Sequence, residues 1–302
     1  MRILFVARCK NGRYAPFITE QVEAIERQGM ECQYCGVSEK GIVGYIRQIP
    51  KLKKSIRDFH PDIIHAHYGL CGLLSNFQRR IPVVTTYHGS DINDPTVFWL
   101  SRLSICFSRF NIFVSRKNLD IARPRKNFAL IPCGVNLGDF PLIDKLEARR
   151  QMGMDPSARI VLFAGAFDNP VKNASLAKEA MALVPEAVLL ELKGFTRQQV
   201  ACLMQAADVL LMTSFSEGSP QVIKEALACG CPIVSVDVGD VRERIEGIDG
   251  CYISDRTLES FADCIKKALA FNGRTQGRMV IESIGLTNDV IATRIVSLYE
   301  SL

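Results

Sequence analysis

Two carboxylates eight positions apart, Glu217 and Glu225, enclose a short Gly-Ser-Pro turn and the start of an amphipathic stretch, Gln221–Ala228. Gly218 allows a close approach of the backbone to a ligand. Pro220 suits the start of a helix, where a missing N–H is not needed. The first turn of a helix offers unpaired N–H groups and the positive end of the helix dipole, which together favour a phosphate. The segment therefore predicts an anion site with hydroxyl-binding carboxylates on either side.

A nucleotide sugar has this layout, because its pyrophosphate lies between ribose hydroxyls and sugar hydroxyls. An ordinary turn and helix with solvated glutamates would have the same spacing, so the motif alone leaves both interpretations open. The first expected strand is followed by a turn, Cys9–Pro16, that holds a single glycine. Dinucleotide-binding turns need the glycines of a GxGxxG pattern, so this turn argues against an NAD or FAD oxidoreductase.

Short, continuous apolar runs alternate with amphipathic stretches along the chain, which is typical of parallel sheets covered by helices. The expected strands are Ile3–Ala7, Ile63–Ala66, Val83–Thr86, Ile112–Val114, Ala129–Ile131, Ile160–Ala164, Val188–Leu192, Val209–Met212 and Ile233–Val236. The expected helices include Pro16–Gln28, Leu52–Asp58, Ser175–Leu183, Arg197–Ala206 and Gln221–Ala228. Two such series predict an α/β protein with two Rossmann-like domains.

We expect an N-terminal domain over residues 1–140, a C-terminal domain over 141–285, and a last helix over 286–302 that returns to the N-terminal domain. Ligands of open α/β sheets bind beyond the carboxyl ends of the strands. The site is therefore expected in a cleft between the two domains.

Composition excludes several classes of protein. With 302 residues, 48% hydrophobic and 23% charged, the chain can fill a sizeable core. Its 11 cysteines lack zinc spacing, so we expect reduced thiols in a cytoplasmic protein and no metal. No apolar run reaches the roughly 18–20 residues of a membrane span.

Charge is unevenly distributed. Residues 1–140 hold 20 Lys and Arg against 11 Asp and Glu, while the remainder is net acidic. A basic half fits an anionic membrane surface, an anionic substrate or ordinary solvated helix faces. No RNA-binding motif or recognition-helix pattern is present, so nucleic acid is not expected. This pattern suggests peripheral attachment at the inner face of the plasma membrane.

The segment Glu217–Glu225 and its continuation Ala226–Val234 resemble the E-x7-E motif of the family 4 retaining glycosyltransferases of the GT-B fold. The resemblance covers nearly the whole chain. Other segments similar to the family are Asp62–His67, Val84–Asp91, Ile131–Asn136, Ala207–Ser214 and Val238–Glu243. In detail the chain is similar to short bacterial members that build cell-surface polysaccharides, such as the teichuronic-acid type.

The resemblance implies a donor site in the C-terminal domain. Glu225 would hold the ribose hydroxyls of the nucleotide, and Glu217 would accept hydrogen bonds from hydroxyls of the donor sugar. The backbone of Gly218, Ser219 and Pro220 would face the sugar and the pyrophosphate. The nucleotide sugar would be a substrate, so no cofactor and no metal are implied.

Further roles are implied outside the motif. Lys172 would contact the diphosphate, Gly12 would let the backbone of the first loop meet the phosphate, and His88 would lie near the donor sugar and the acceptor. Family members usually have an Arg shortly before the Lys, whereas Gly165–Asn169 has none. Another cation would take its place, and Arg13 is the candidate.

The implied activity is transfer of a sugar from a nucleotide-sugar donor to a lipid-linked or growing cell-surface glycan. The segment Val188–Arg197 is shorter than the family's base-reading insertion, which leaves UDP and GDP open, with a UDP-sugar favoured. Two alternatives stay open. One is a nucleotide-sugar 2-epimerase of the same fold, and the other is a non-catalytic subunit that binds a nucleotide sugar.

Overall fold

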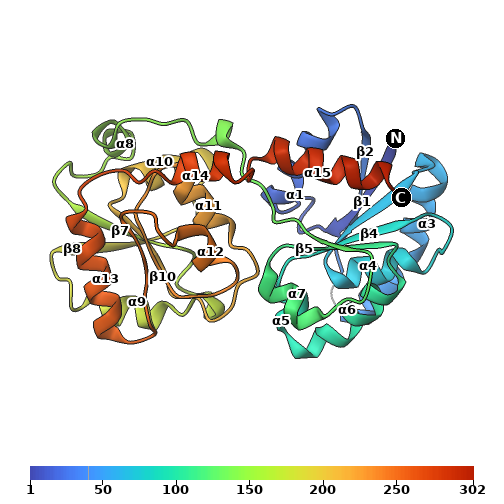
Figure 1. Cartoon of the computed structure of the whole chain (residues 1–302), viewed down its shortest axis with the longest axis horizontal. Helices are drawn as coiled ribbons and strands as arrows, with labels where there is room; N and C mark the ends of the chain where they lie inside the picture. Colours follow the sequence, from blue (N-terminus) through green and yellow to red (C-terminus); the bar gives the residue numbers. More distant parts are fainter. Residues whose placement is uncertain (40) are drawn as a thin grey trace. The chain divides into compact units, whose positions relative to one another are not determined.

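The computed structural model describes residues 1–39 and 41–302. The chain divides into two compact units (Figure 1). Unit 1 comprises residues 1–134 and 288–302, and unit 2 comprises residues 135–287. Each unit is an α/β domain with its own parallel sheet.

The sheet of unit 1 has six parallel strands in the order β2-β1-β3-β4-β5-β6. These strands are β1 (Arg2–Arg8), β2 (Glu31–Val37), β3 (Ile63–His67), β4 (Val83–Tyr87), β5 (Phe110–Phe113) and β6 (Phe128–Leu130). The chain runs outward from β1 to β2 and then returns to the other side of β1 as β3. The strand order therefore reverses between β1 and β3, which is where ligands of open sheets bind.

Helices cover both faces of this sheet. They are α1 (Pro16–Glu26), α2 (Gly41–Arg47), α3 (Ile49–Phe59), α4 (Gly69–Asn76), α5 (Ser90–Asn93), α6 (Pro95–Phe107), α7 (Arg116–Ala122) and α15 (Asn288–Glu300). Leu4 packs in one apolar cluster with Leu52 of α3 and Leu74 of α4. The next residue, Phe5, points to the opposite face, where it lies against the ring of His65.

The last helix, α15, packs against α1 of unit 1, and Figure 1 shows the two helices side by side. The Arg27 guanidinium, just after α1, donates to Asp289 Oδ1 at 2.7 Å. The Tyr299 ring is buried and lies edge-on to the ring of His65. The predicted return of the C-terminal helix to the N-terminal domain is thereby confirmed.

The sheet of unit 2 has five parallel strands in the order β11-β10-β9-β7-β8. They are β7 (Arg159–Phe163), β8 (Ala187–Glu191), β9 (Val209–Met212), β10 (Ile233–Ser235) and β11 (Cys251–Ile253). Its helices are α8 (Lys145–Gln151), α9 (Ala174–Met181), α10 (Arg197–Ala206), α11 (Gln221–Ala228), α12 (Val241–Ile245), α13 (Leu258–Ala270) and α14 (Gly277–Ser283). Here the strand order reverses between β7 and β9.

The boundaries between the units differ slightly from those expected. The structure divides the chain at 134/135 and 287/288, whereas the sequence analysis placed the boundaries at 140/141 and 285/286. The reason for the first difference lies at Phe140, which is fully buried in unit 2. Arg278 of α14 donates to the backbone oxygens of Phe140 at 2.8 Å and Leu137 at 3.3 Å, which ties these residues to unit 2.

Within residues 1–39 and 41–302, none of the helices has the length and apolar character that crossing a bilayer requires. The same residues include no cluster of three or more His, Cys, Asp or Glu side chains placed to hold a metal ion.

Candidate active site

The loops that follow β7 and β9 are joined where the strand order of unit 2 reverses. The Thr213 hydroxyl, directly after β9, lies within hydrogen-bond distance of the backbone oxygens of Lys172 at 2.8 Å and Asn173 at 2.9 Å. The Phe215 N–H donates to the backbone oxygen of Val171 at 2.9 Å. These bonds hold the two loops together at one edge of the sheet, although the loops are distant in the sequence.

Lys172 and Glu217 form an ion pair at this edge. Lys172 Nζ lies 2.7 Å from Glu217 Oε1, and the two side chains are 20% and 17% exposed. Lys172 ends a single 3-10 turn, Pro170–Lys172. A Cβ at Gly165 would come within 2.9 Å of Lys172 Cγ, so the glycine leaves room for the lysine stem. The structure thus brings together the predicted diphosphate ligand and the predicted sugar ligand.

Glu225, in α11, is paired with a cation that the sequence analysis did not single out. Arg197 Nη1 donates to Glu225 Oε1, and the guanidinium also lies over the Phe140 ring at 4.8 Å. Glu225 is 7% exposed. Arg197 is the first residue of α10 and follows the N-cap residue Thr196. Its place at a helix start was evident from the sequence, but its partner on α11 was not.

The Gly-Ser-Pro turn packs against the loop after β10. The Ser219 hydroxyl donates to Asp240 Oδ2 at 2.7 Å, and Arg244 Nε donates to the same oxygen at 2.9 Å. Gly239 has a φ of +57°, and a Cβ there would lie 2.3 Å from the backbone oxygen of Gly218. Only glycine fits this close approach without strain.

Helix α11 begins without a side-chain cap from its own N-cap residue. That residue is Pro220, whose side chain has no hydrogen-bonding group, and it is buried. Pro220 was expected at the start of the helix, and it lies one residue before the first helical residue. Backbone N–H groups at such a helix start suit an anionic ligand.

His88 follows β4 at the carboxyl edge of the sheet of unit 1. Its Nε2 lies 2.9 Å from His67 Nδ1, and its Nδ1 lies 3.6 Å from Cys133 Sγ. The rings of Phe17 and Tyr68 flank it, with centroids 4.9 and 4.8 Å away. His88 is therefore held in a fixed orientation by rings and hydrogen bonds.

Behind His88, two buried histidines continue the stack into the core of unit 1. The ring centroids of His65 and His67 are 4.7 Å apart. His65 Nε2 lies 2.7 Å from the Thr86 hydroxyl, and its Nδ1 is hydrogen-bonded to the Tyr299 hydroxyl. Burial lowers the pKa of His65 well below its usual range, and burial lowers the pKa of His67 to about 3. Both rings are therefore neutral in the folded protein at pH 7.

These pKa shifts predict acid sensitivity of unit 1. Below about pH 6.5 the unfolded chain binds protons at both histidines while the folded chain does not, so folding stability falls as the pH falls. Each histidine contributes a slope of about 1.4 kcal/mol per pH unit. Burial raises the pKa of Asp91 to about 6, and this carboxyl opposes the trend between about pH 4 and 6, because there the folded state holds its proton.

Urea unfolding between about pH 7 and pH 4 tests this expectation. The free energy of unfolding should fall with pH, since two histidines outweigh one carboxyl. A His67→Gln variant should show a shallower slope than the unmodified chain, whatever its absolute stability. Equal slopes for the two proteins would contradict the neutral buried state of His67.

The first loop of unit 1 places Gly12 and Arg13 in a tight turn after β1. The Lys10 N–H donates to the Arg13 backbone oxygen at 2.9 Å, and the Arg13 N–H donates to the Lys10 backbone oxygen at 3.0 Å. Gly12 has a φ of +76°, and a Cβ there would meet nothing within 4 Å. The glycine thus serves the turn conformation. Contact of Gly12 and Arg13 with a donor phosphate stays a prediction.

Solved structures share the fold of the chain. Sucrose-phosphate synthase from Thermosynechococcus elongatus matches with a TM-score of 0.87 at 17% identity, over 99% of this chain and 98% of that one. HepE from Anabaena, solved in complex with UDP, matches with a TM-score of 0.76 at 17% identity, over 100% of both chains. The chain therefore has the GT-B fold of two Rossmann-like domains, as expected from the sequence.

Family models match each half of the chain. The model described as Glycosyltransferase Family 4 matches residues 25–139, and the one described as Glycosyl transferases group 1 matches residues 162–270. The chain therefore carries a glycosyltransferase family 4 domain in its first half and a glycosyl transferases group 1 domain in its second half.

Two relatives of the chain are also described as glycosyltransferases. The TuaC protein of Bacillus subtilis, described as a putative teichuronic acid biosynthesis glycosyltransferase, is 28% identical over 242 residues, which cover 70% of this chain and 62% of TuaC. D-inositol 3-phosphate glycosyltransferase of Mycolicibacterium gilvum is 24% identical over 273 residues, which cover 73% of this chain and 61% of the relative. The chain thus spans about three fifths of the length of these relatives.

Proposed function

We propose that the chain transfers a sugar from a nucleotide-sugar donor to a lipid-linked or growing cell-surface glycan, with retention of configuration. The observation that carries the proposal is the arrangement around the start of α11. Lys172 and Glu217 are paired beside it, and Glu225 lies within the helix. This cluster occupies the carboxyl edge of the unit 2 sheet where the strand order reverses, the usual ligand position in such sheets.

The ion pairs indicate how the donor would bind. Lys172 and Glu217 pair with each other at 2.7 Å. A bound donor would supply a diphosphate for Lys172 and sugar hydroxyls for Glu217, so each side chain would exchange its partner without being left unpaired. Glu225 would accept hydrogen bonds from the ribose hydroxyls with one carboxylate oxygen, while the other oxygen, Oε1, stays paired with Arg197.

Catalysis would then rest on stabilising the leaving diphosphate. Lys172 and the N–H groups at the start of α11 present positive charge where negative charge grows as the glycosidic bond breaks. The diphosphate itself would take the proton of the acceptor hydroxyl on the same face of the sugar. His88, held firmly by its neighbours, would position the sugar or the acceptor.

UDP is the favoured nucleotide. Structures of HepE, a protein of the same fold, are described as complexes with UDP and with UDP-glucose. Another protein of this fold, starch synthase IV of Arabidopsis thaliana, is described as bound to ADP. Because these proteins of one fold are described with different nucleotides, a direct comparison of UDP-, GDP- and ADP-sugars is needed to identify the base of the donor.

A transfer assay tests the proposal. The purified chain is incubated with labelled UDP-, GDP- or ADP-sugars and with short-chain polyprenyl diphosphate sugars as acceptors, and both nucleotide release and labelled product are measured. Acceptor-dependent release of one nucleotide supports a transferase. Change of the sugar nucleotide without acceptor would identify a 2-epimerase, and binding without any turnover would identify a binding subunit.

Peripheral membrane contact is a second part of the proposal, and one surface of unit 1 supports it. Two hollows of about 710 and 470 Å³ share Arg80 and Ile81. Phe77 and Phe107 line them and are 64% and 52% exposed. We call this the basic surface, defined by Lys53, Arg57, Phe77, Arg79, Arg80, Phe107 and Arg109. Exposed rings among cations fit the interface of an anionic bilayer.

Vesicle binding tests this contact. The unmodified chain should bind vesicles of phosphatidylserine and phosphatidylcholine, and salt should weaken the binding. The double variant Arg79→Gln/Arg80→Gln should bind about 30-fold more weakly, since each charge contributes about 1 kcal/mol near such a surface. The control is Arg125→Gln/Lys126→Gln, which changes two exposed cations outside the basic surface. Equal losses in both variants, or binding insensitive to salt, would refute the assignment of this surface.

A further inference from the structure

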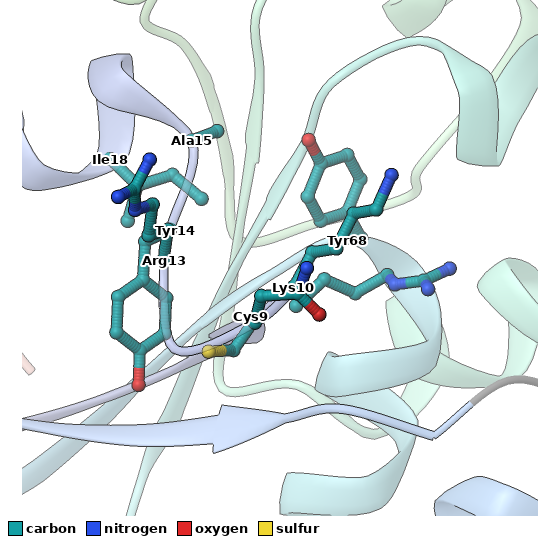
Figure 2. Close-up of a pocket in the computed structure, with 9 residues that line it drawn as sticks. Cys9, Lys10, Arg13, Tyr14, Ala15, Ile18 and Tyr68 are labelled. Atoms are coloured by element: carbon teal, nitrogen blue, oxygen red, sulfur yellow. The ribbon is translucent and has the colours of Figure 1, made fainter.

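A pocket of about 690 Å³ opens in unit 1 at the carboxyl ends of β1 and β3, the point where the strand order of this sheet reverses. The side chains that line it include Arg8, Lys10, Arg13, Tyr14 and Tyr68. In Figure 2, Arg13 and Tyr14 lie on one side of the pocket, and Lys10 and Tyr68 lie on the other. The pocket therefore combines cations with two phenol rings at the position where sheets of this type bind ligands.

The turn after β1 holds two of these cations opposite each other. Lys10 and Arg13 exchange both backbone hydrogen bonds, with Asn11 at φ 51° and Gly12 at φ 76° between them. Two consecutive residues of positive φ are typical of a type I′ turn, for which Asn-Gly is the favoured pair. Both cations line the pocket, and Figure 2 shows Arg13 on the side of Tyr14 and Lys10 on the side of Tyr68. The turn thus presents positive charge to the pocket from two sides, where a bound anion would be attracted by both cations.

These cations have no acidic partner in the described part of the chain. Among residues 1–39 and 41–302, no ion pair includes Arg8, Lys10 or Arg13. The described residues that line the pocket include no Asp or Glu. A concave surface with cations of one sign attracts anions and holds them by charge-assisted hydrogen bonds.

The two tyrosines supply neutral donors and ring faces. Burial, with the nearby Cys9 and Cys35 thiols, raises the pKa of Tyr14 to about 12, and burial raises the pKa of Tyr68 above its usual range. Both hydroxyls therefore stay protonated. The Tyr14 hydroxyl lies close to Gly36 of β2, and the Tyr68 hydroxyl can donate to an anion or to a sugar hydroxyl. The Tyr14 ring is stacked on Tyr34 with centroids 4.6 Å apart, which fixes its position.

Tyr68 is held in a conformation that a tyrosine rarely adopts. Its φ is +74°, and its N–H donates to the backbone oxygen of Thr86 at 2.8 Å. The next N–H, of Gly69, donates to Asp91 Oδ2 at 2.9 Å. A strained residue of this kind is typical of ligand sites. The Tyr68 ring also packs on His88, so the pocket is continuous with the predicted acceptor residue.

We propose that this pocket binds a phosphate group carried by the acceptor, with Lys10 and Arg13 as its main ligands. The proposal rests on the proposed glycosyl transfer and adds the chemical class of the acceptor. It reassigns Arg13 from the donor diphosphate, where the sequence analysis placed it, to the acceptor. The phosphate belongs either to a free sugar phosphate or to a lipid-linked sugar diphosphate.

Calorimetry on the full chain tests the proposal with two probes, glucose 1-phosphate and geranyl diphosphate, each with and without saturating UDP. The variant is Lys10→Gln/Arg13→Gln, and the control is Arg125→Gln/Lys126→Gln, which removes the same charges elsewhere on unit 1. We expect at least one probe to bind in the presence of UDP and to bind at least about tenfold more weakly to the Lys10/Arg13 variant, since each lost charge-assisted hydrogen bond contributes about 1.5–3 kcal/mol. The control should match the unmodified chain, and neither variant should weaken the binding of UDP.

The outcomes separate this proposal from the proposed function. Binding of glucose 1-phosphate points to a sugar phosphate, and binding of geranyl diphosphate alone points to a lipid diphosphate. Binding of neither probe, equal weakening in the control, or no weakening in the Lys10/Arg13 variant overturns the acceptor site. If UDP displaces the probe and the variant weakens UDP itself, the pocket serves the donor and the proposal is wrong. Absence of UDP binding to the unmodified chain would instead count against the donor site of unit 2, whatever the probes show.

Discussion

Replacing Lys172 by Ala should lower the turnover number for sugar transfer by about 10²–10³-fold, the usual cost of removing one preorganised group that stabilises developing negative charge. Lys172 faces Glu217 at 2.7 Å and its side chain is only 20% exposed, so its charge acts with little screening by water. The loss should appear in the turnover number more than in the Michaelis constant for the donor, because the charge on the diphosphate grows during bond cleavage. Initial rates of nucleotide release with acceptor present measure both constants.

Lys266→Ala is the matched control for this variant. Lys266 is an exposed residue on α13 of the same unit, and its loss changes the net charge equally. Its turnover should equal that of the unmodified chain. A Lys172→Ala protein that kept its turnover, with the melting temperature unchanged, would remove Lys172 from the catalytic group and with it the account of the leaving diphosphate.

Replacing Glu225 by Gln should weaken nucleotide binding by about ten- to a hundredfold, because hydrogen bonds to a charged acceptor contribute about 1.5–3 kcal/mol. Gln keeps the shape of the side chain, which matters because Glu225 is 7% exposed and paired with Arg197. The ribose assignment adds a sharper expectation. The unmodified chain should bind UDP more tightly than 2′-deoxy-UDP, and the Glu225→Gln variant should discriminate less between them.

Glu282→Gln on α14 serves as the control, since this glutamate is exposed and α14 packs against α11. It should keep both the affinity for UDP and the preference over 2′-deoxy-UDP. If Glu225→Gln retained the full preference while binding UDP more weakly, Glu225 would act through Arg197 or through the helix, and the ribose contact would be wrong.

Much of the fold could be predicted, because buried parallel strands and amphipathic helices leave strong periodic patterns. The expected helices Arg197–Ala206 and Gln221–Ala228 have the bounds of α10 and α11. Strand β11, Cys251–Ile253, was not expected. It has only 3 residues at the edge of its sheet, too few to show a pattern. The first domain boundary differs because Phe140 is bound to unit 2 by a contact with Arg278, far along the chain.

The site was predicted less completely. Family resemblance pointed to Lys172, Glu217 and Glu225 as single residues, but the Lys172–Glu217 pair depends on the closeness of the β7 and β9 loops in the folded sheet. Arg197 was not predicted, because an arginine at the start of a helix is common and only the fold places it against Glu225. The turn at Gly12 was interpreted as a phosphate loop, and the reciprocal hydrogen bonds between Lys10 and Arg13 give it the geometry of a hairpin turn.

The central claim is that unit 2 carries a nucleotide site built around Glu217 and Glu225. The most direct test is a thermal-shift series on the purified chain with UDP, GDP, ADP and their sugar conjugates, and with NAD as the comparison. A ligand that binds only the folded state raises the melting temperature with its concentration. We predict a clear, concentration-dependent rise with one nucleotide and its sugar conjugates, strongest for UDP, lost in Glu225→Gln and absent with NAD. A well-folded chain whose melting temperature responds to none of the nucleotides, or responds to NAD alone, would contradict the account.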